Sequence, residues 1–294
     1  MKNILITGAG PNGFVGRNLK EILQYKYNIY APSSKELDLC NYEEVEKYII
    51  KNSITSIIHS AVHNPRTKGA DGEIENNLRM YFNLAKLSCK LEKLIYFGSG
   101  AEFDKRFDIN MVKEEEFGKT IPLDPYGFTK YIMNEHAMKS KNIYNLRLFG
   151  IFGKYEYWQS KFISNLCCKA IYDLPLTIRK NCWFDFLYIN DLPKIVEWFL
   201  ENDPKYHDYN VCYGKPLDLV SIAEIVKEVS GKDLQMVLFD KEGFNLEYTA
   251  SNDRLLEEIP ELKLTSYHES IKDLYKYYND NKEQIDYYVL KDTR

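Results

Sequence analysis

The amino-acid sequence predicts an α/β protein with two parts, a doubly wound parallel sheet and a smaller α/β lobe that binds the substrate. In the first half of the 294 residues, short apolar segments alternate with amphipathic ones. Buried apolar strands that alternate with helices are typical of parallel sheets whose two faces are both covered. A glycine-rich turn, from Gly8 to Gly16, directly follows the first apolar segment. Because ligands of such sheets bind beyond the carboxyl ends of the strands, this turn predicts where a binding site begins.

The elements of the first half follow from this alternation. Residues 3–7 form a continuous apolar run and predict the first strand, while the apolar positions of residues 14–24 recur at helical spacing. Further strands are predicted at residues 28–31, 56–61, 93–99 and 143–149, and further helices at residues 42–51, 72–90 and 126–140.

The second half of the chain is less regular. We predict that residues 1–153 and 184–212 form the dinucleotide-binding domain, and that residues 154–183 and 213–294 form the substrate lobe. No linker rich in Pro, Gly or Ser separates them, so we expect the two parts to form one rigid unit. The predicted elements are a helix at 158–172, strands at 184–189, 209–213 and 235–239, helices that begin at residues 190–191 and 221, and helices that begin after residues 251 and 266.

Composition and charge narrow the class of protein. A net charge of −4 with scattered basic residues argues against a nucleic-acid or acidic-membrane partner. No apolar run reaches the roughly 20 residues of a membrane span, and the apolar start meets Gly8 too early for a signal peptide. The six cysteines form no Cys-x-x-Cys pair and the five histidines are dispersed, so we predict reduced thiols and no metal site. We therefore expect a cytoplasmic, metal-free protein.

The turn after the first predicted strand has the spacing Gly-x-Gly-x-x-Gly. Glycine allows a positive φ and a close approach of the backbone to a ligand. The start of the following helix offers free N–H groups and a positive dipole end to a diphosphate. With a strand before it and a helix after it, the turn predicts a dinucleotide site, and the alternative is a tight turn without a ligand. The residues expected around the cofactor here are Gly8, Gly10, Asn12, Gly13, Phe14, Val15, Ser60 and Ala61.

The end of the second predicted strand bears on the choice of cofactor. NAD-binding sites usually place an acid there to bind the ribose hydroxyls. Residues 31–35 contain two serines and Lys35, and no acid comes before Glu36. Two hydroxyls and a cation suit a 2′-phosphate, to which Arg17 adds charge, so NADP(H) is favoured over NAD(H). The alternative is that Lys35 is simply solvated and both cofactors bind. The residues expected to contact this end of the cofactor are Ser33, Ser34, Lys35, Asp38 and Leu39, with Asp38 and Leu39 beside the adenine.

Tyr126 and Lys130 stand one helical turn apart and therefore share one face of a predicted helix. The Tyr-x-x-x-Lys spacing occurs three more times, but only this pair follows both the glycine turn and the predicted strand that ends in Ser99. An ammonium nearby should lower the pKa of Tyr126 from about 10, which suits a proton donor near neutral pH. Lys130 can also bind the ribose of the cofactor, and Ser99 can stabilise charge that develops on a carbonyl oxygen. The three residues predict nicotinamide-dependent reduction of a carbonyl group, and the alternative is a surface helix near a capping serine.

With the glycine turn, Ser99 and the Tyr126–Lys130 pair in this order, the chain resembles the extended short-chain dehydrogenase/reductases. Within them it resembles the nucleotide-sugar epimerases, dehydratases and reductases, over nearly its whole length. The resemblance implies a Rossmann-type domain, a small sugar-nucleotide lobe and a homodimer formed through a four-helix bundle. The further segments that carry it are residues 77–84, 147–153, 184–191, 209–214 and 221–224.

The residues that follow Ser99 differ from those of similar enzymes. The 4,6-dehydratases that the chain resembles have an Asp-Glu pair directly after the catalytic Ser or Thr. Here Gly100 and Ala101 stand in that place, and Glu102, one position late, is expected to be structural. GDP-fucose synthases, which are also similar, epimerise with a Cys shortly after the serine and a His in a later helix. No cysteine closely follows Ser99, and Lys161 stands at the helical position. The resemblance and these departures favour a 4-keto reductase without epimerase or dehydratase activity.

The predicted substrate site also departs from the family pattern. In the family an arginine usually precedes Asp-Phe, and this arginine is expected to bind the diphosphate. Here Phe184 stands in its place. Arg179, Lys180 or Arg254 could take its place. For Lys161 and Asn165, which are predicted to lie on a helix, the alternative is an ordinary solvated position. The residues expected to bind the substrate are Lys161, Asn165, Arg179 and Arg254.

The predicted function is NADPH-dependent reduction at C4 of a nucleotide-diphosphate-linked 4-keto-6-deoxy sugar, in deoxysugar biosynthesis for surface polysaccharide. The resemblance favours a GDP-linked hexose or heptose, with CDP and dTDP left open. One alternative is an NAD-dependent nucleotide-sugar 4-epimerase, and another is a non-catalytic NAD(P)-sensing binding protein. Among the remaining residues, His63 is predicted at the surface, with a position facing the active-site cleft as the alternative, while Trp158 and Trp183 are predicted either in the core or beside the substrate.

Overall fold

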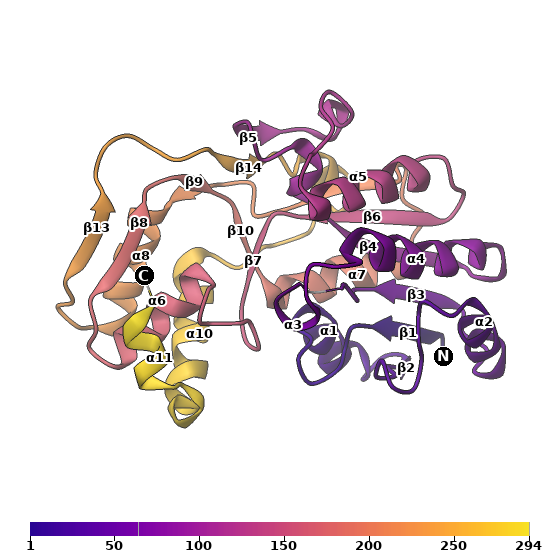
Figure 1. Ribbon diagram of the computed structural model, residues 1–294, viewed down its shortest axis with the longest axis horizontal. Coiled ribbons are helices and arrows are strands. Elements are labelled where there is room, and N and C mark those ends of the chain that lie inside the picture. Colours follow the sequence, from indigo (N-terminus) through magenta and orange to yellow (C-terminus); the bar gives the residue numbers. More distant parts are fainter. Residues whose placement is uncertain (64, 294) are drawn as a thin grey trace.

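The computed structural model describes residues 1–63 and 65–293. A six-stranded sheet with the order β11-β6-β4-β3-β1-β2 lies at the centre of one half of the molecule (Figure 1), and all of its strand pairs are parallel. Because β2 and β3 lie on opposite sides of β1, the sheet reverses its direction of growth there, which is where such sheets bind ligands. The predicted Rossmann-type α/β fold is therefore confirmed. The strands are β1 Asn3–Thr7, β2 Asn28–Tyr30, β3 Ser56–His59, β4 Lys93–Ser99, β6 Ile143–Leu148 and β11 Asp208–Val211.

Helices cover both faces of this sheet. Successive residues of β1 point to opposite faces, as expected for a strand. Ile4 and Ile6 therefore pack in one apolar cluster with residues of α1 and α7, whereas Leu5 packs in another with residues of α2 and α4. In the described part of the chain, no helix is both long enough and apolar enough to cross a membrane. The helices of this half are α1 Val15–Leu23, α2 Tyr42–Lys51, α3 Pro65–Lys68, α4 Glu73–Lys86, α5 Pro125–Ala137 and α7 Leu192–Glu201.

The other half of the molecule contains small sheets and helices that pack on one another. Helices α6, α8 and α10 contact each other, and Figure 1 shows them with α11 at the end opposite to the large sheet. A four-stranded sheet has the order β12-β9-β14-β5, and two-stranded sheets pair β10 with β7 and β13 with β8. The helices are α6 Phe162–Ile171, α8 Leu219–Ser230, α9 Asp253–Glu258, α10 Tyr267–Asp280 and α11 Tyr287–Asp292. The strands are β5 Ile109–Val112, β7 Gly150–Phe152, β8 Leu176–Lys180, β9 Trp183–Phe184, β10 Phe186–Tyr188, β12 Leu217–Asp218, β13 Met236–Asp240 and β14 Tyr248–Ala250.

Several boundaries differ from those predicted from the sequence. The helix predicted at 158–172 begins at Phe162, because Lys161 has an extended backbone and precedes the helix as its cap. The strand predicted at 184–189 is two strands, β9 and β10, that belong to different sheets. The long helix predicted to residue 90 ends at Lys86 and is followed by a short 3-10 helix, Ser88–Lys90. Strand β5 had no predicted counterpart and pairs with β14. The division into domains stays a prediction. The pairing of β5 with β14 joins a segment of the predicted dinucleotide-binding domain to a segment of the predicted substrate lobe.

Candidate active site

Part of the predicted cofactor and catalytic set lies at the carboxyl ends of three neighbouring strands. The glycine turn follows β1, Ser60 and Ala61 follow β3, and Ser99 ends β4. These strands are adjacent and parallel, so the three segments meet at one edge of the sheet. Ser60 Oγ donates a hydrogen bond of 2.6 Å to the carbonyl oxygen of Thr7, which joins two of the segments directly.

The glycine turn is tightly folded against its surroundings. Gly8 has a φ of +71°, and a Cβ there would lie 2.7 Å from the backbone nitrogen of Ala61. A Cβ on Gly13 would lie 2.0 Å from the carbonyl oxygen of Gly8. The N–H of Gly13 donates 2.8 Å to the carbonyl oxygen of Gly10, which closes the turn. Side chains at Gly8 or Gly13 would therefore collide with backbone atoms, which cannot move aside.

Gly10 differs from these glycines, and the difference fits a diphosphate. A Cβ on Gly10 would meet no heavy atom of the described residues within 4 Å, so this side of the turn is open. Helix α1 begins directly afterwards at Val15, and within the described residues the Phe14 side chain makes no capping hydrogen bond. Its first N–H groups are thus available to an anion. An open turn beside an uncapped helix start fits the diphosphate of a dinucleotide.

The end of β2 differs from the expectation in one respect. Glu36 was considered too far along the chain to replace the acid of NAD-binding sites. In the structure its Oε2 accepts hydrogen bonds from the backbone N–H of Ser33, at 2.7 Å, and from Ser33 Oγ, at 2.8 Å. These bonds place a carboxylate among the residues that were predicted to bind a 2′-phosphate. Ser34, Lys35 and Asp38 are exposed, and Leu39 is buried in the core.

Helix α5 carries two of the three predicted catalytic residues. It begins at Pro125, and the Asp124 side chain caps it by accepting a hydrogen bond of 2.9 Å from the N–H of Gly127. Lys130 is buried, and its Nζ donates 2.7 Å to the carbonyl oxygen of Phe97 on β4. The same Nζ lies 5.8 Å from the centre of the Tyr126 ring. The bond to β4 thus fixes α5 next to the strand that ends in Ser99.

The protonation of this pair differs from the prediction. Burial raises the pKa of Tyr126 to about 12, although interaction with Ser99 lowers it in part. Burial also lowers the pKa of Lys130 to about 8, against an opposing effect of Glu102. The expectation that Lys130 brings the pKa of Tyr126 toward neutrality was therefore wrong for the protein alone. The reason is that both groups are desolvated, and the amino group is directed at a carbonyl oxygen of β4.

Ser99 stands at the start of a 3-10 helix, Gly100–Phe103, and caps it. Its Oγ accepts a hydrogen bond of 3.2 Å from the N–H of Ala101, and its own N–H donates 3.0 Å to Glu102 Oε1. A second phenol also reaches this serine, because the hydroxyl of Tyr248 lies 3.4 Å from Ser99 Oγ. Sequence reasoning missed Tyr248, which is far away along the chain and belongs to no recognisable motif.

Glu102 has the structural role that was expected for it. Its Oε2 accepts a hydrogen bond of 2.7 Å from Nε of Arg147, and both side chains are fully buried. Arg147 also pairs with Asp208 at 2.8 Å and donates 2.9 Å to Asn210 Oδ1. A carboxylate that is enclosed in such an ion pair is not available for acid–base chemistry.

The four predicted substrate residues have different environments. Lys161 and Arg179 are exposed, on the cap of α6 and on β8. Asn165 is buried and donates 2.9 Å to Thr293 Oγ1. Arg254 pairs with Asp208 at 2.8 Å and with Glu115. The contacts of Asn165 and Arg254 thus lead to the protein itself, and substrate binding by these four residues stays a prediction.

Aromatic rings surround Ser99 on the side of the lobe. Phe184, which replaces the usual arginine, stacks on Phe186 with ring centres 4.4 Å apart. It also lies 5.0 Å from the ring of Tyr248, which in turn lies 5.3 Å from Phe149. The change from arginine to phenylalanine therefore makes this part of the site apolar.

Three other residues can now be placed. His63 is buried, which corrects the prediction of a surface position: its Nε2 lies 2.9 Å from the carbonyl oxygen of Gly69, with which it shares a hydrogen bond. The cause is the chain after β3, which folds back so that Asn77 Oδ1 also accepts the His63 N–H at 2.7 Å. Trp158 packs in the core, and Trp183 is exposed and stacks on Phe244.

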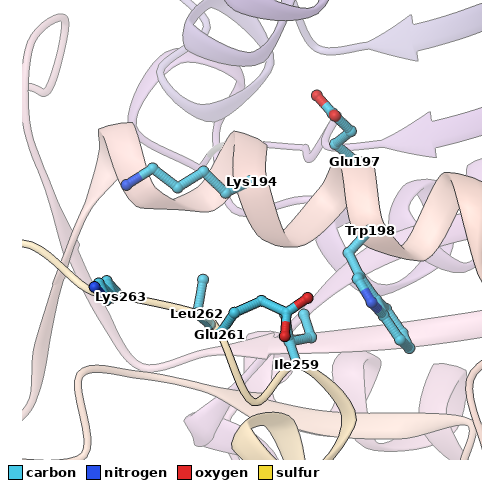
Figure 2. A pocket seen from close by; sticks show the side chains of 7 residues that line it. All are labelled: Lys194, Glu197, Trp198, Ile259, Glu261, Leu262 and Lys263. Atoms are coloured by element: carbon cyan, nitrogen blue, oxygen red, sulfur yellow. The ribbon is translucent and has the colours of Figure 1, made fainter.

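Two cavities lie outside this site. One, of about 390 Å³, is formed by α7 and the segment 259–263, and Figure 2 shows that charged and apolar side chains both line it. The other, of about 610 Å³, includes Arg254 and Tyr206. The residues lining these cavities do not include Ser99, Tyr126 or Lys130. The candidate active site therefore rests on the edge of the sheet rather than on either cavity.

Comparison with known proteins places the chain in a family. The model of the NAD dependent epimerase/dehydratase family matches residues 4–212, which is more than half of the chain. GDP-L-colitose synthase of Yersinia pseudotuberculosis is 24% identical in an alignment of 257 positions that covers 78% of this chain and 82% of that protein.

Solved structures share the fold at low sequence identity. The crystal structure of a GDP-L-fucose synthetase from Naegleria fowleri bound to NADP has a TM-score of 0.80 and 19% identity, and covers 96% of this chain and 95% of that one. GDP-mannoheptose C4 reductase from Campylobacter jejuni, with NADP bound, has a TM-score of 0.78 and 19% identity, and covers 94% and 98%. The segment that the family model matches, residues 4–212, contains the glycine turn, Ser99, Tyr126 and Lys130. The chain belongs to the NAD dependent epimerase/dehydratase family.

Proposed function

We propose that this protein is an NADPH-dependent reductase that acts at C4 of a nucleotide-diphosphate-linked 4-keto-6-deoxy sugar. The observation that carries the proposal is the surroundings of Ser99. Ser99, Tyr126 and Lys130 meet at the edge of the sheet beside the glycine turn, and the first carboxylate after Ser99, Glu102, is enclosed in an ion pair with Arg147. This set of residues suits proton donation to a reduced carbonyl group and lacks the side chains of the related dehydratases and epimerases.

The roles of the residues follow from their positions. A bound dihydronicotinamide supplies a hydride to C4 of the sugar. Tyr126 donates the proton that the C4 oxygen takes up, and Ser99 donates a hydrogen bond to the same oxygen and orients it. Lys130 binds the ribose of the cofactor and, through its bond to the carbonyl oxygen of Phe97, holds α5 and Tyr126 beside β4. The turn at Gly10 and the start of α1 bind the diphosphate.

The choice of cofactor and substrate is also part of the proposal. NADP(H) is supported by Ser33, Ser34 and Lys35 at the end of β2 and by the NADP in similar structures. A GDP-linked hexose or heptose is supported by the names of three of the similar proteins, which contain GDP. We further propose a cytoplasmic homodimer that works in deoxysugar biosynthesis for surface polysaccharide.

Oxidation of NADPH against a panel of GDP-, CDP- and dTDP-linked 4-keto-6-deoxy sugars tests the function. We expect oxidation with at least one member, fastest with a GDP-linked sugar. The matched control uses nucleotide sugars with a hydroxyl group at C4, which give the enzyme no ketone to reduce. If neither NADPH nor NADH is oxidised with any keto sugar, the proposal is wrong.

Glu36 favours a second candidate, an NAD-dependent nucleotide-sugar 4-epimerase. Its carboxylate at Ser33 is the type of group that binds the 2′- and 3′-hydroxyls of NAD and repels a 2′-phosphate. An epimerase of this kind would retain NAD during purification and interconvert two C4 epimers without added cofactor. Analysis of nucleotides released from the denatured protein separates the two candidates.

A further inference from the structure

No sequence motif predicts the position of Tyr248 at the active site. It begins β14, and its hydroxyl lies 3.4 Å from Ser99 Oγ. The same hydroxyl occupies the space next to Gly100, since a Cβ on Gly100 would lie 2.6 Å from it. In related dehydratases this position after the catalytic residue carries an acid. Here Gly100 leaves the space to a phenol from a distant strand.

The Tyr248 ring is fixed by its neighbours. Its centre lies 5.0 Å from that of Phe184 and 5.3 Å from that of Phe149. Both neighbours are aromatic, so the ring is packed on two sides and only its hydroxyl can approach Ser99. A phenol packed in this way directs its O–H at one partner.

The hydrogen-bonding capacity of Ser99 decides what Tyr248 does there. A serine hydroxyl has one proton and accepts two hydrogen bonds. The N–H of Ala101 takes one acceptor position, at 3.2 Å. If Tyr248 donates a hydrogen bond to the second acceptor position of Ser99 Oγ, Ser99 does not donate its own proton to Tyr248. The Ser99 proton is then free for the substrate. We infer that Tyr248 is a positioning residue, which donates its O–H to Ser99 and thereby directs the Ser99 proton at the C4 oxygen of the substrate.

This inference rests on the proposed reduction and is consistent with the protonation of Tyr248. Burial raises the pKa of Tyr248 well above its usual range, so the phenol keeps its proton and can donate it. The hydrogen bond with Ser99 lowers this pKa in part, while Tyr126 and Glu102 raise it further. A hydroxyl that accepts a hydrogen bond becomes a better donor, so the chain from Tyr248 through Ser99 to the substrate oxygen strengthens its last bond.

The test compares Tyr248→Phe with Tyr96→Phe. Tyr248→Phe keeps the ring and removes only the O–H, and we expect kcat for the keto sugar to fall about tenfold with KM changed less than about twofold. Tyr96 is buried on β4, and its hydroxyl has no hydrogen-bond partner in the described part of the chain. Its replacement by Phe should leave kcat unchanged. Equal kcat values for Tyr248→Phe and the native protein would overturn the inference.

A double variant separates positioning through Ser99 from an independent or merely structural role. If Tyr248 acts through Ser99, then Ser99→Ala/Tyr248→Phe is no slower than Ser99→Ala alone. If the two losses multiply, Tyr248 does not act through Ser99, and the inference is wrong. Circular dichroism and urea unfolding of each variant check that the fold is retained.

A measurement that needs no turnover distinguishes failure of this inference from failure of the proposed function. The full-length protein is labelled with carbon-13 at Cζ of tyrosine, and the Tyr248 resonance is identified by its loss in Tyr248→Phe. Ser99→Ala should shift this resonance, because it removes the group that receives the Tyr248 O–H. An unmoved resonance overturns the inference, whether or not any keto sugar is reduced.

Discussion

Lys130 has its amino group inside the protein, bonded to the carbonyl oxygen of Phe97. Burial disfavours the ammonium form and lowers the pKa from 10.5 to about 8. Between these two values the unfolded chain binds a proton that the folded chain does not. The contribution of Lys130 to the free energy of unfolding therefore increases as the pH rises through this range, and it is least favourable below about pH 8.

Replacement of Lys130 by Met removes this dependence on pH. The difference in unfolding free energy between the native protein and Lys130→Met should change in favour of the native protein by up to about 3 kcal/mol between pH 8 and 10.5. Urea unfolding at the two ends of the range measures it. Lys141→Met, at an exposed position, is the matched control and should change the free energy of unfolding by no more than about 0.5 kcal/mol. A difference for Lys130→Met that is constant with pH would show that the buried amine does not titrate as described.

The Tyr126 hydroxyl is the proposed proton donor, so its removal should affect the chemical step rather than binding. Tyr126→Phe should lower kcat by about 10²- to 10⁴-fold, the usual contribution of a general acid. The dissociation constant of the cofactor, measured by fluorescence or calorimetry, should stay within about twofold, because the ring remains in place. Unchanged turnover of a keto sugar would contradict the catalytic role.

The predictability of individual residues depended on how far their partners lie along the chain. Tyr126 and Lys130 share a helix face, and Ser99 ends a strand, so local pattern and order were enough to bring them together. Tyr248 reaches Ser99 only through the pairing of β14 with β5 and β9, which no local pattern encodes. His63 was assigned to the surface because nothing near it in the sequence indicates that Asn77 and Gly69 enclose it.

The glycine turn before α1 contains two kinds of glycine. Some are required by the conformation of the backbone, and one is required only if a ligand binds there. Gly13 and Gly8 are required by the backbone, because a side chain on either would collide with main-chain atoms. Gly10 faces open space and has no such restriction in the protein alone. A requirement for glycine at this position can therefore come only from a ligand that approaches closely.

Gly10→Ala and Gly13→Ala should separate these two needs. Gly13→Ala should lower the melting temperature, since its Cβ would lie 2.0 Å from the Gly8 oxygen. Gly10→Ala should leave the melting temperature of the cofactor-free protein unchanged and weaken dinucleotide binding at least about tenfold. Differential scanning fluorimetry and a cofactor titration give both quantities. Full-strength cofactor binding by Gly10→Ala would mean that the diphosphate lies elsewhere.

Prediction at the scale of elements was accurate where a pattern is local, and less so where the chain changes sheets. The strands of the large sheet were found close to their actual bounds, although β6 and β11 carry buried polar residues such as Arg147 and Asp208. The apolar run from Phe184 to Ile189 reads as one strand, yet it divides at Asp185. There the buried carboxylate accepts hydrogen bonds from the N–H groups of Tyr213 and Gly214, at 2.7 and 2.8 Å, so the break depends on a distant turn.

The two halves of the molecule are joined by a buried network of charges. Asp208, on the edge strand of the large sheet, pairs with Arg147 inside that sheet and with Arg254 of α9, each at 2.8 Å. Arg147 also pairs with Glu102. Strands and helices from distant parts of the sequence therefore depend on one fully buried guanidinium.

Arg147→Met should destabilise the whole molecule. It leaves the carboxylates of Glu102 and Asp208 buried with reduced compensation, and loss of one partner of a buried ion pair typically costs about 3–5 kcal/mol. Urea unfolding measures the loss, and we expect a single transition because the network joins both halves. Lys139→Met, at an exposed position with a surface pair to Glu135, is the control and should change stability by less than about 1 kcal/mol. An equally small effect for Arg147→Met would contradict the structural role of the network.

Assembly of the whole molecule was predictable in outline, because the alternating first half and the irregular second half imply a large sheet and a separate lobe. The connection between them was not. Strand β5 lies in a segment between β4 and α5 that has little apolar pattern, and its place is set by pairing with β14. Arg254 was expected at the substrate for its charge alone, whereas its three carboxylate partners come from two other segments of the chain.

The space beside Gly100 also limits how this enzyme can change its reaction. A side chain at residue 100 would meet the Tyr248 hydroxyl and the Phe149 ring, each at 2.6 Å. An acidic residue there, introduced first, would be harmful in the present background, while the same change would be tolerated once residues 248 and 149 had become smaller. The mutational path from the proposed reductase toward a dehydratase is therefore ordered, and the early steps lie at residues that are far along the chain from the one whose chemistry would change.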